Sequence, residues 1–172
     1  ISGPVNLSPI PEVSLIQVSS SKEMKEAICE NIKEMDFIFM SAAVSDFTIE
    51  NVSNKKIKRS KSDMKLHLRP VQDIVKSITK KTDAVIIAFA LETHNGEYEA
   101  KRKLIEKNLD FIILNYANEE GAGCGSLTNR VIIFSKDGER VELKKDYKER
   151  IAEKIIQYIL ISIKQKPSLI EN

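Results

Sequence analysis

The stretch Asp83-Ala-Val-Ile-Ile-Ala-Phe-Ala-Leu-Glu-Thr93 decides the predicted fold of this chain. An earlier stretch, Asp36-Phe-Ile-Phe-Met-Ser-Ala-Ala-Val-Ser-Asp-Phe47, has the same order: an aspartate, an almost continuous apolar run, and then small or charged residues. Continuous apolar runs are typical of parallel strands that are covered on both faces. We therefore expect two buried parallel strands, and we expect the strand from 36 to 42 to be central in its sheet.

Working outward from these strands, hydrophobic periodicity predicts alternating strands and helices. Strands are expected at 13–18, 36–42, 84–90, 111–115, 131–134 and 141–143, with a further short one near Leu66. Helices are expected from the serine cap at 19–21 to about 33, and at 72–80, 97–108 and 146–163. Parallel neighbours need crossovers of helical length, so this alternation predicts an α/β fold with a Rossmann-like, mostly parallel sheet and helices on both faces.

The last part of the chain predicts a C-terminal β-hairpin followed by a helix. Lys136-Asp-Gly138 separates two short apolar runs, which is a hairpin signal. In the final helix, isoleucines recur every fourth residue from Ile151 to Ile163, and in the helix at 97–108 we expect Leu104 and Ile105 to face inward. We predict one domain over 1–165 and a tail over 166–172.

The composition predicts a globular protein and gives no general reason to expect a polyanionic partner. The chain has 172 residues, of which 42% are hydrophobic and 30% charged, and its formal net charge is +2. Such a charge favours neither nucleic acid nor a membrane surface as a partner. No apolar run reaches the roughly 20 residues that span a bilayer. The two cysteines, Cys29 and Cys124, lack metal-ligand spacing, so we expect a reducing cytoplasm and no protein-held metal.

Basic residues follow both apolar strands. The first strand is followed by Lys55-Lys-Ile-Lys-Arg59, within an aperiodic segment at 51–69, and the second by a helix that carries Lys103 and Lys107. In an open α/β sheet, ligands bind outside the carboxyl ends of the strands. Both clusters are therefore predicted to meet one phosphate-bearing small molecule. The alternative interpretation, a solvated loop and an exposed helix face, stays open for each.

Three other residues stand at or near predicted strand ends. Asp46 follows Ser41-Ala-Ala43, whose small side chains let a ligand approach the backbone, and it can orient a ribose, a base or Mg²⁺, or only cap a turn. Phe89 can stack on a base or belong to the core. Asn115 can contact a ligand or cap a turn.

Other site classes are disfavoured by the sequence. The segment Gly121-Ala-Gly-Cys-Gly125 does not follow a first strand, as a dinucleotide-binding loop would. His67 and His94 lie in unrelated segments, with no Ser-His-Asp or Cys-His spacing. Nucleophilic hydrolase chemistry is therefore not expected.

Together these residues resemble the phosphopantothenoylcysteine synthetase (phosphopantothenate-cysteine ligase) family. Four motifs occur in the family's order: Ser2-Gly-Pro4, Ser41-Ala-Ala-Val-Ser-Asp46, Lys56-Ile-Lys-Arg59 and Phe89-Ala-Leu-Glu-Thr93. The resemblance extends to about Lys154. The family carries an earlier strand-helix portion that is not matched here, and the first residue is not methionine, so we expect a fragment that lacks the amino-terminal part.

The resemblance implies an activity. The family activates the carboxylate of 4′-phosphopantothenate with CTP and Mg²⁺ to give an acyl-cytidylate, which L-cysteine then attacks, in coenzyme A biosynthesis. It also implies a homodimer, and a phosphopantothenoylcysteine decarboxylase fused to or associated with the ligase.

The resemblance also implies roles for individual residues. Lys56 and Lys58 correspond to catalytic lysines on a flap that closes on the triphosphate. The implied nucleotide contacts are Asp46, Lys56, Gln72, Asp73, Ile74, Val75, Phe89, Lys103 and Lys107. The implied substrate contacts are Ala42, Ala43 and Asn115. The chain departs from the family at Gln72, where a proline is usual, and at Leu91, where an alanine is usual.

Two other classes of function remain as alternatives. A nicotinamide-dependent oxidoreductase of similar fold would need a glycine-rich first turn, which these residues lack. A nucleic-acid-binding module that used the basic segment 55–69 would show binding that falls steeply with salt.

Overall fold

The computed structural model describes residues 1–6, 8–59, 63–119 and 125–164. The chain forms two compact units. Unit 1 comprises Ile1–Met35 and Ala42–Asp83, and unit 2 comprises Asp36–Ser41 and Ala84–Asn172. The predicted single domain over 1–165 and the tail over 166–172 stay predictions, because residues 165–172 lie outside the described part of the chain.

Unit 2 is built on a five-stranded sheet with the order β1-β4-β5-β6-β7. Its strands are β1 Phe37–Met40, β4 Val85–Glu92, β5 Phe111–Tyr116, β6 Thr128–Ser135 and β7 Arg140–Tyr147. The pairs β1–β4 and β4–β5 are parallel, whereas β5–β6 and β6–β7 are antiparallel. Four of the five strands therefore run in one direction, which confirms the predicted mostly parallel sheet.

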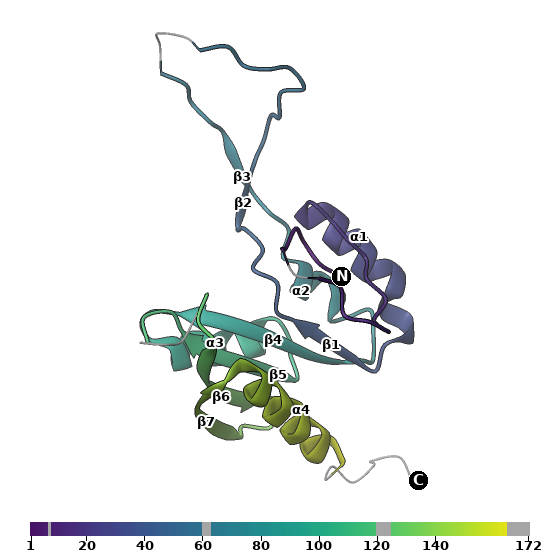
Figure 1. The fold of residues 1–172 in the computed structure, drawn as a ribbon, viewed down its shortest axis with the longest axis vertical. Helices are drawn as coiled ribbons and strands as arrows, with labels where there is room; N and C mark the ends of the chain where they lie inside the picture. Colours follow the sequence, from purple (N-terminus) through teal and green to yellow (C-terminus); the bar gives the residue numbers. More distant parts are fainter. Residues whose placement is uncertain (7, 60–62, 120–124, 165–172) are drawn as a thin grey trace. The chain divides into compact units, whose positions relative to one another are not determined.

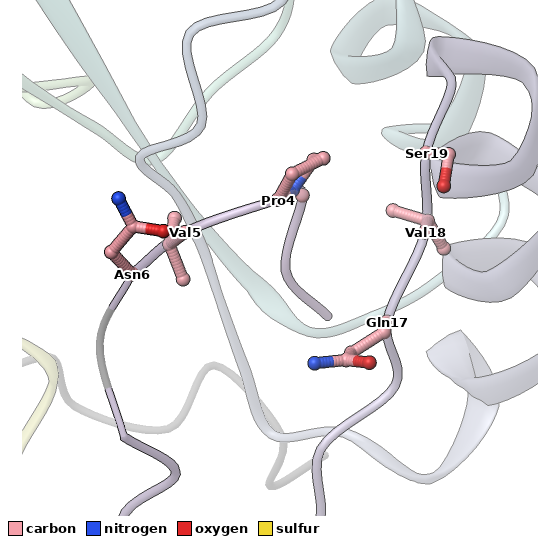
Figure 2. A pocket seen from close by; sticks show the side chains of 7 residues that line it. Pro4, Val5, Asn6, Gln17, Val18 and Ser19 are labelled. Carbon is pink, nitrogen blue, oxygen red and sulfur yellow. The ribbon is translucent and has the colours of Figure 1, made fainter.

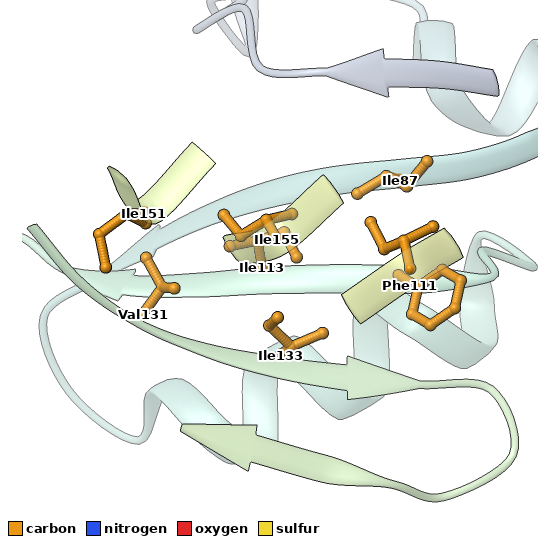
Figure 3. Packing of buried hydrophobic residues seen from close by; sticks show 8 residues of the cluster. Ile87, Phe111, Ile113, Val131, Ile133, Ile151 and Ile155 are labelled. Atoms are coloured by element: carbon orange, nitrogen blue, oxygen red, sulfur yellow. The ribbon is translucent and has the colours of Figure 1, made fainter. Parts of the chain in front are cut away.

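Helices cover both faces of this sheet. Helix α4 (Lys148–Lys164) packs its isoleucines against Ile87, Phe111 and Ile133, as Figure 3 shows for part of this cluster. Helix α3 (Gly96–Glu106) covers the opposite face, where the ammonium of Lys101 lies 5.0 Å from the ring centroid of Phe134. Side chains alternate between the faces of a strand, so consecutive buried residues serve different helices. The predicted hairpin and final helix are confirmed.

The described residues of unit 1 form two short helices, one 3₁₀ turn and a two-stranded ribbon. Its elements are α1 Ser21–Asn31, η1 Ile32–Glu34, β2 Phe47–Ile49, β3 Leu68–Pro70 and α2 Ile74–Ile78. Strands β2 and β3 are antiparallel, and the described residues between them, 50–59 and 63–67, extend away from α1 and α2 (Figure 1). We call the segment from 50 to 67 the flap.

Helix α1 begins where the serine cap predicted it. The side-chain oxygen of Ser20 accepts a hydrogen bond from the backbone N–H of Glu23 at 3.2 Å, and the Glu23 carboxylate accepts one from the N–H of Ser19 at 2.8 Å. These bonds satisfy donors that a helix start otherwise leaves without partners. The hydrogen bond from the Ser19 N–H is the main cause that holds the pKa of the Glu23 carboxyl below its ordinary value.

Two strand predictions are wrong. Strand β1 lies at the edge of its sheet rather than at its centre, and Phe39 is 41% exposed, because an apolar run does not reveal how many partners a strand has. The segment 13–18 is not a strand. Its Gln17 makes only an isolated parallel bridge with Ser2, through Ser2 N–H to Ile16 O and Val18 N–H to Ser2 O, both 2.9 Å.

Two details of the other elements also differ from expectation. In α3 the buried residues are Gly96, Ala100 and Leu104, so Ile105 lies on the adjoining face and is 79% exposed, contrary to the prediction. The helix predicted at 72–80 covers only Ile74–Ile78, and strand β2 was not predicted. The strand expected near Leu66 is confirmed as β3, two residues later.

None of the helices in the described part of the chain has the length and apolar character that would let it span a bilayer.

Candidate functional site

The carboxyl-terminal half of β4 exposes an aromatic side chain, whereas the preceding residues of the strand are buried or half-buried. Phe89 is 38% exposed and Leu91 is 48% exposed, whereas Ile87 is fully buried. The three residues point to the α4 face because they alternate with the buried alanines of the strand. Asn115 of β5 is the register partner of Leu91 and lies half-buried on the same face. This end of the sheet therefore presents an aromatic face, an aliphatic side chain and an amide side by side.

The opposite face of the same strand end carries an ion pair. Glu92, the last residue of β4, accepts a hydrogen bond from Lys103 of α3, with Nζ and Oε1 2.5 Å apart. The sheet therefore places Lys103 and Phe89 on opposite faces and does not by itself bring them together. Lys107 caps the carboxyl end of α3, and its backbone N–H donates to the Lys103 carbonyl at 3.0 Å.

Sequence reasoning did not assign a role to Glu92. The signal was present, because an acidic residue ends an apolar strand just before the helix that carries the lysines. Spacing alone could not show that this carboxylate reaches Lys103 rather than another basic residue of α3.

The turn between β4 and α3 is held by the chain that follows β5. The backbone N–H of Ala117 donates to the Glu92 carbonyl at 2.9 Å, and the side-chain amide of Asn118 donates to the Thr93 carbonyl at 3.4 Å. Gly96 is buried against Tyr116, and a methyl group there would lie 2.7 Å from the ring. Glycine at this position allows the close packing of the turn.

In unit 1, the flap carries the predicted catalytic lysines. It is closed by the pairs Phe47–Pro70 and Ile49–Leu68 of the β2–β3 ribbon. Lys56 and Lys58 are both exposed and form no hydrogen bond or ion pair with the described residues. Their ammonium groups are therefore available to an anion.

The residues before β2 leave open space beside them. Ala42 and Ala43 are exposed and belong to no helix or strand, and Ala43 lines a cavity of about 360 Å³ together with Ser20 of the α1 start and Thr48 of β2. Asp46 is exposed, and its carboxylate forms no bond with any described residue, although its carbonyl accepts the N–H of Val71 at 2.8 Å.

A second cavity of about 360 Å³ lies between residues 3–6 and 17–19. Figure 2 shows Pro4 and Asn6 on one side of it and Gln17 and Val18 on the other. No residue of the predicted site lines it.

The predicted contacts at 72–75 lie at the start of α2. The Gln72 side chain accepts a hydrogen bond from Lys25 Nζ at 2.6 Å, and Asp73 caps the helix by accepting from the N–H of Lys76 at 3.0 Å. Ile74 is 4% exposed, so only its backbone can meet a ligand, and Val75 is half-buried. Asp73 therefore has a structural role as a cap.

Some sequence predictions lie outside the described residues. These are the first four residues of the glycine-rich segment from Gly121 to Gly125, which include Cys124, and residues 60–62 of the basic segment 55–69. Among the described residues, no cluster of three or more His, Cys, Asp or Glu side chains could hold a metal ion.

Comparison with known proteins shows to which family this chain belongs. The family described as "DNA/pantothenate metabolism flavoprotein C-terminal domain" matches residues 1–162, which is nearly the whole chain. The chain belongs to this family. The match covers both units, the flap and the β4–α3 turn, and it confirms the resemblance inferred from the motifs.

Similar proteins support the same family. The coenzyme A biosynthesis bifunctional protein CoaBC of Bacillus subtilis is 39% identical over 167 residues, which are 96% of this chain and 41% of that protein. A protein named cysteine/cysteine sulfinic acid decarboxylase, from an unknown prokaryotic organism, is 41% identical over 161 residues, 92% of this chain and 45% of that protein. The chain thus spans less than half the length of these relatives.

A solved structure confirms the fold of this family member. The crystal structure of the C-terminal domain of the coenzyme A biosynthesis bifunctional protein CoaBC superposes with a TM-score of 0.77 at 32% sequence identity. The match covers 95% of this chain and 75% of that one. The Rossmann-like α/β prediction is therefore confirmed, whereas the roles of individual site residues stay predictions.

Proposed function

We propose that this chain is a phosphopantothenate-cysteine ligase of coenzyme A biosynthesis. It would use CTP and Mg²⁺ to convert the carboxylate of 4′-phosphopantothenate into an acyl-cytidylate, and L-cysteine would then displace CMP. The observation that carries the proposal is the exposed Phe89 at the carboxyl end of β4 in a member of this family. The name of the Bacillus subtilis relative, which concerns coenzyme A biosynthesis, supports the same pathway.

Phe89 is suited to hold the base of the nucleotide. Exposing an aromatic ring at the end of a buried strand costs apolar burial, and a stacked base recovers that burial. Asn115, on the same face, offers donors and acceptors that can meet polar groups of a base or of the pantothenate chain. Leu91 leaves less room for a base on this face than the alanine that is usual in the family.

The lysines are suited to the triphosphate. An ammonium acts as a compact point charge toward phosphate oxygens, and it stabilises the charge that develops as pyrophosphate leaves. In unit 2 this role falls to Lys103 and Lys107. In unit 1 it falls to Lys56 and Lys58, whose exposed ammonium groups support a catalytic role for the flap.

Magnesium would enter with the nucleotide rather than as a resident ion. Mg²⁺ usually keeps several waters and binds through substrate phosphates and one or two carboxylates. The exposed, unpaired carboxylate of Asp46 fits such a contact. The bound ion would supply positive charge to the phosphates.

The second substrate would approach the small residues of unit 1. Ala42 and Ala43 lack bulky side chains, and the cavity that Ala43 lines has room for part of phosphopantothenate. Asn115 is the third substrate contact that we propose. A homodimer, and a decarboxylase fused to or associated with this chain, belong to the same proposal.

Calorimetric titration tests the nucleotide site. The purified protein would be titrated with CTP and with ATP in Mg²⁺, and the titrations repeated on Lys103→Ala, Lys56→Ala and Phe89→Ala. Removing one stacking ring is expected to weaken binding by about 1 to 3 kcal/mol, and each lysine substitution is expected to weaken it about tenfold. Lys101→Ala is the matched control, because Lys101 lies on α3 against Phe134 instead.

Two results would contradict the proposal. One is the absence of saturable binding of either nucleotide, and the other is equal affinity in the wild type and all three variants. Binding of single-stranded nucleic acid that falls steeply with salt, without free-nucleotide binding, would favour the alternative function of the flap. Pyrophosphate release that depends on phosphopantothenate would then test the reaction itself.

A further inference from the structure

The ion pair between Glu92 and Lys103 joins two elements of unit 2 at the ligand end of the sheet. Nζ and Oε1 lie 2.5 Å apart, and the side chains are 33% exposed for Lys103 and 17% exposed for Glu92. Arg102, one residue earlier on α3, pairs with Glu99 and Glu106 of its own helix instead. Lys103 is thus drawn toward the sheet, whereas Arg102 is held along the helix.

Glu92 is the rigid partner of this pair. Its backbone is fixed by the register of β4 with β5, where it faces Tyr116, and by the hydrogen bond from Ala117. Lys103 has four rotatable methylene groups between its backbone and its charge. The position of the Lys103 ammonium is therefore set by the Glu92 carboxylate rather than the reverse.

We propose that Glu92 is a positioning residue, which holds the Lys103 ammonium at the carboxyl end of β4 for a phosphate oxygen of the nucleotide. The inference rests on the proposed function, because it assumes that Lys103 contacts the nucleotide. A lysine ammonium has three N–H donors. One bonds to Glu92, and two remain for phosphate oxygens, so the lysine need not leave its partner when the nucleotide binds.

Glu92 has two opposing effects on an anionic ligand. Its negative charge repels phosphate, but part of that repulsion is screened by solvent and cancelled by the paired ammonium. Its hydrogen bond orders the Lys103 side chain before the ligand arrives, so the entropy of ordering that side chain is not lost when the ligand binds. We expect ordering to dominate, and the removal of Glu92 therefore weakens nucleotide binding.

A double-mutant cycle tests this inference. The dissociation constant for CTP in Mg²⁺ would be measured for the wild type, Glu92→Ala, Lys103→Ala and the double variant. We expect Glu92→Ala to weaken CTP binding about fivefold in the wild type and not at all when Lys103 is already alanine. Glu92→Gln keeps an oxygen acceptor for the ammonium and should lie between the wild type and Glu92→Ala.

A matched control removes a carboxylate that does not contact Lys103. Glu106→Ala deletes one negative charge from α3, where Glu106 pairs with Arg102, and it should bind CTP as the wild type does. Circular dichroism of each variant would confirm that it is folded at the temperature of the titration.

Each other outcome overturns the inference. An equal loss in both backgrounds would mean that Glu92 supports the fold rather than Lys103, and a gain in affinity would mean that it competes with phosphate. A loss with Lys103→Ala but none with Glu92→Ala would refute the positioning role and leave the proposed function standing. No CTP binding by the wild type would overturn both.

Discussion

Asp110, the residue just before β5, bonds both to Ile86 of β4 and to Lys136, the residue just after β6. Its Oδ2 accepts a hydrogen bond from the N–H of Ile86 at 2.8 Å, and its Oδ1 accepts one from Lys136 Nζ at 2.5 Å. Its own N–H donates to the Ile86 carbonyl at 3.0 Å. Ile86 is only 2% exposed, so water cannot readily replace the carboxylate as the acceptor for its N–H.

Replacing Asp110 by alanine should destabilise the fold far more than removing its ion-pair partner. Asp110→Ala leaves the buried N–H of Ile86 without an acceptor, which costs about 1 to 3 kcal/mol. Lys136→Ala removes only a half-exposed ion pair and should cost about 1 kcal/mol or less. Urea unfolding of both variants measures the difference, and equal losses would show that the carboxylate acts through Lys136 alone.

The candidate site was predictable at this scale only in part. Phe89 could be named because its motif ends a buried strand, and Lys103 because it lies on the helix that follows that strand. The sequence could not show that they lie on opposite faces of the sheet, because that depends on which face α3 covers. The partner of Lys103 was equally hidden, because a long, flexible side chain can reach several carboxylates.

At the scale of elements, the final helix shows how a periodic pattern becomes a buried face. Ile151, Ile155 and Ile159 are 3%, 3% and 1% exposed, as their spacing predicted. Ile156 is the neighbour of Ile155 but is 46% exposed. The two isoleucines are identical in chemistry and differ only in the direction in which α4 points them.

This pair gives a matched test of the packing of α4. Ile155→Ala leaves a cavity against the sheet and should destabilise the protein by about 2 to 5 kcal/mol. Ile156→Ala removes a half-exposed side chain and should cost about 1 kcal/mol. Both variants lose the same atoms, so a similar change in the thermal unfolding midpoint would contradict the packing seen in Figure 3.

Elements were predictable in proportion to their length and regularity. The long helix α4 and the buried strands β4 and β5 carry enough residues for a clear period or a continuous apolar run. Strand β2 has only three residues, alternately exposed and half-buried, which is too short for a period to be seen. The edge position of β1 was not predictable. An apolar run indicates that a strand tends to be buried, but it does not show how many neighbouring strands pair with it.

At the scale of the whole molecule, charge is nearly balanced, and much of it is organised into ion pairs. Around β6 and β7 a network joins Glu97, Arg140, Glu142, Arg130 and Glu119. A hydrogen bond from Arg140 is the main cause that lowers the pKa of Glu97, and one from Arg130 is the main cause that lowers the pKa of Glu142. Both carboxylates therefore favour the folded state while they are ionised.

The lowered pKa values predict how stability depends on pH. A glutamate whose pKa is lower in the folded protein contributes stability above its unfolded value, about 4.5, and loses it as the pH falls through the folded value. The urea midpoint should therefore fall between about pH 5 and about pH 3, and it should fall less in Arg140→Gln, which cannot hold Glu97 ionised. Lys144→Gln is the control, because Lys144 lies on the same strand and has no partner among the described residues. If Arg140→Gln and Lys144→Gln lost stability in acid to the same extent, the effect would come from net charge rather than from this network.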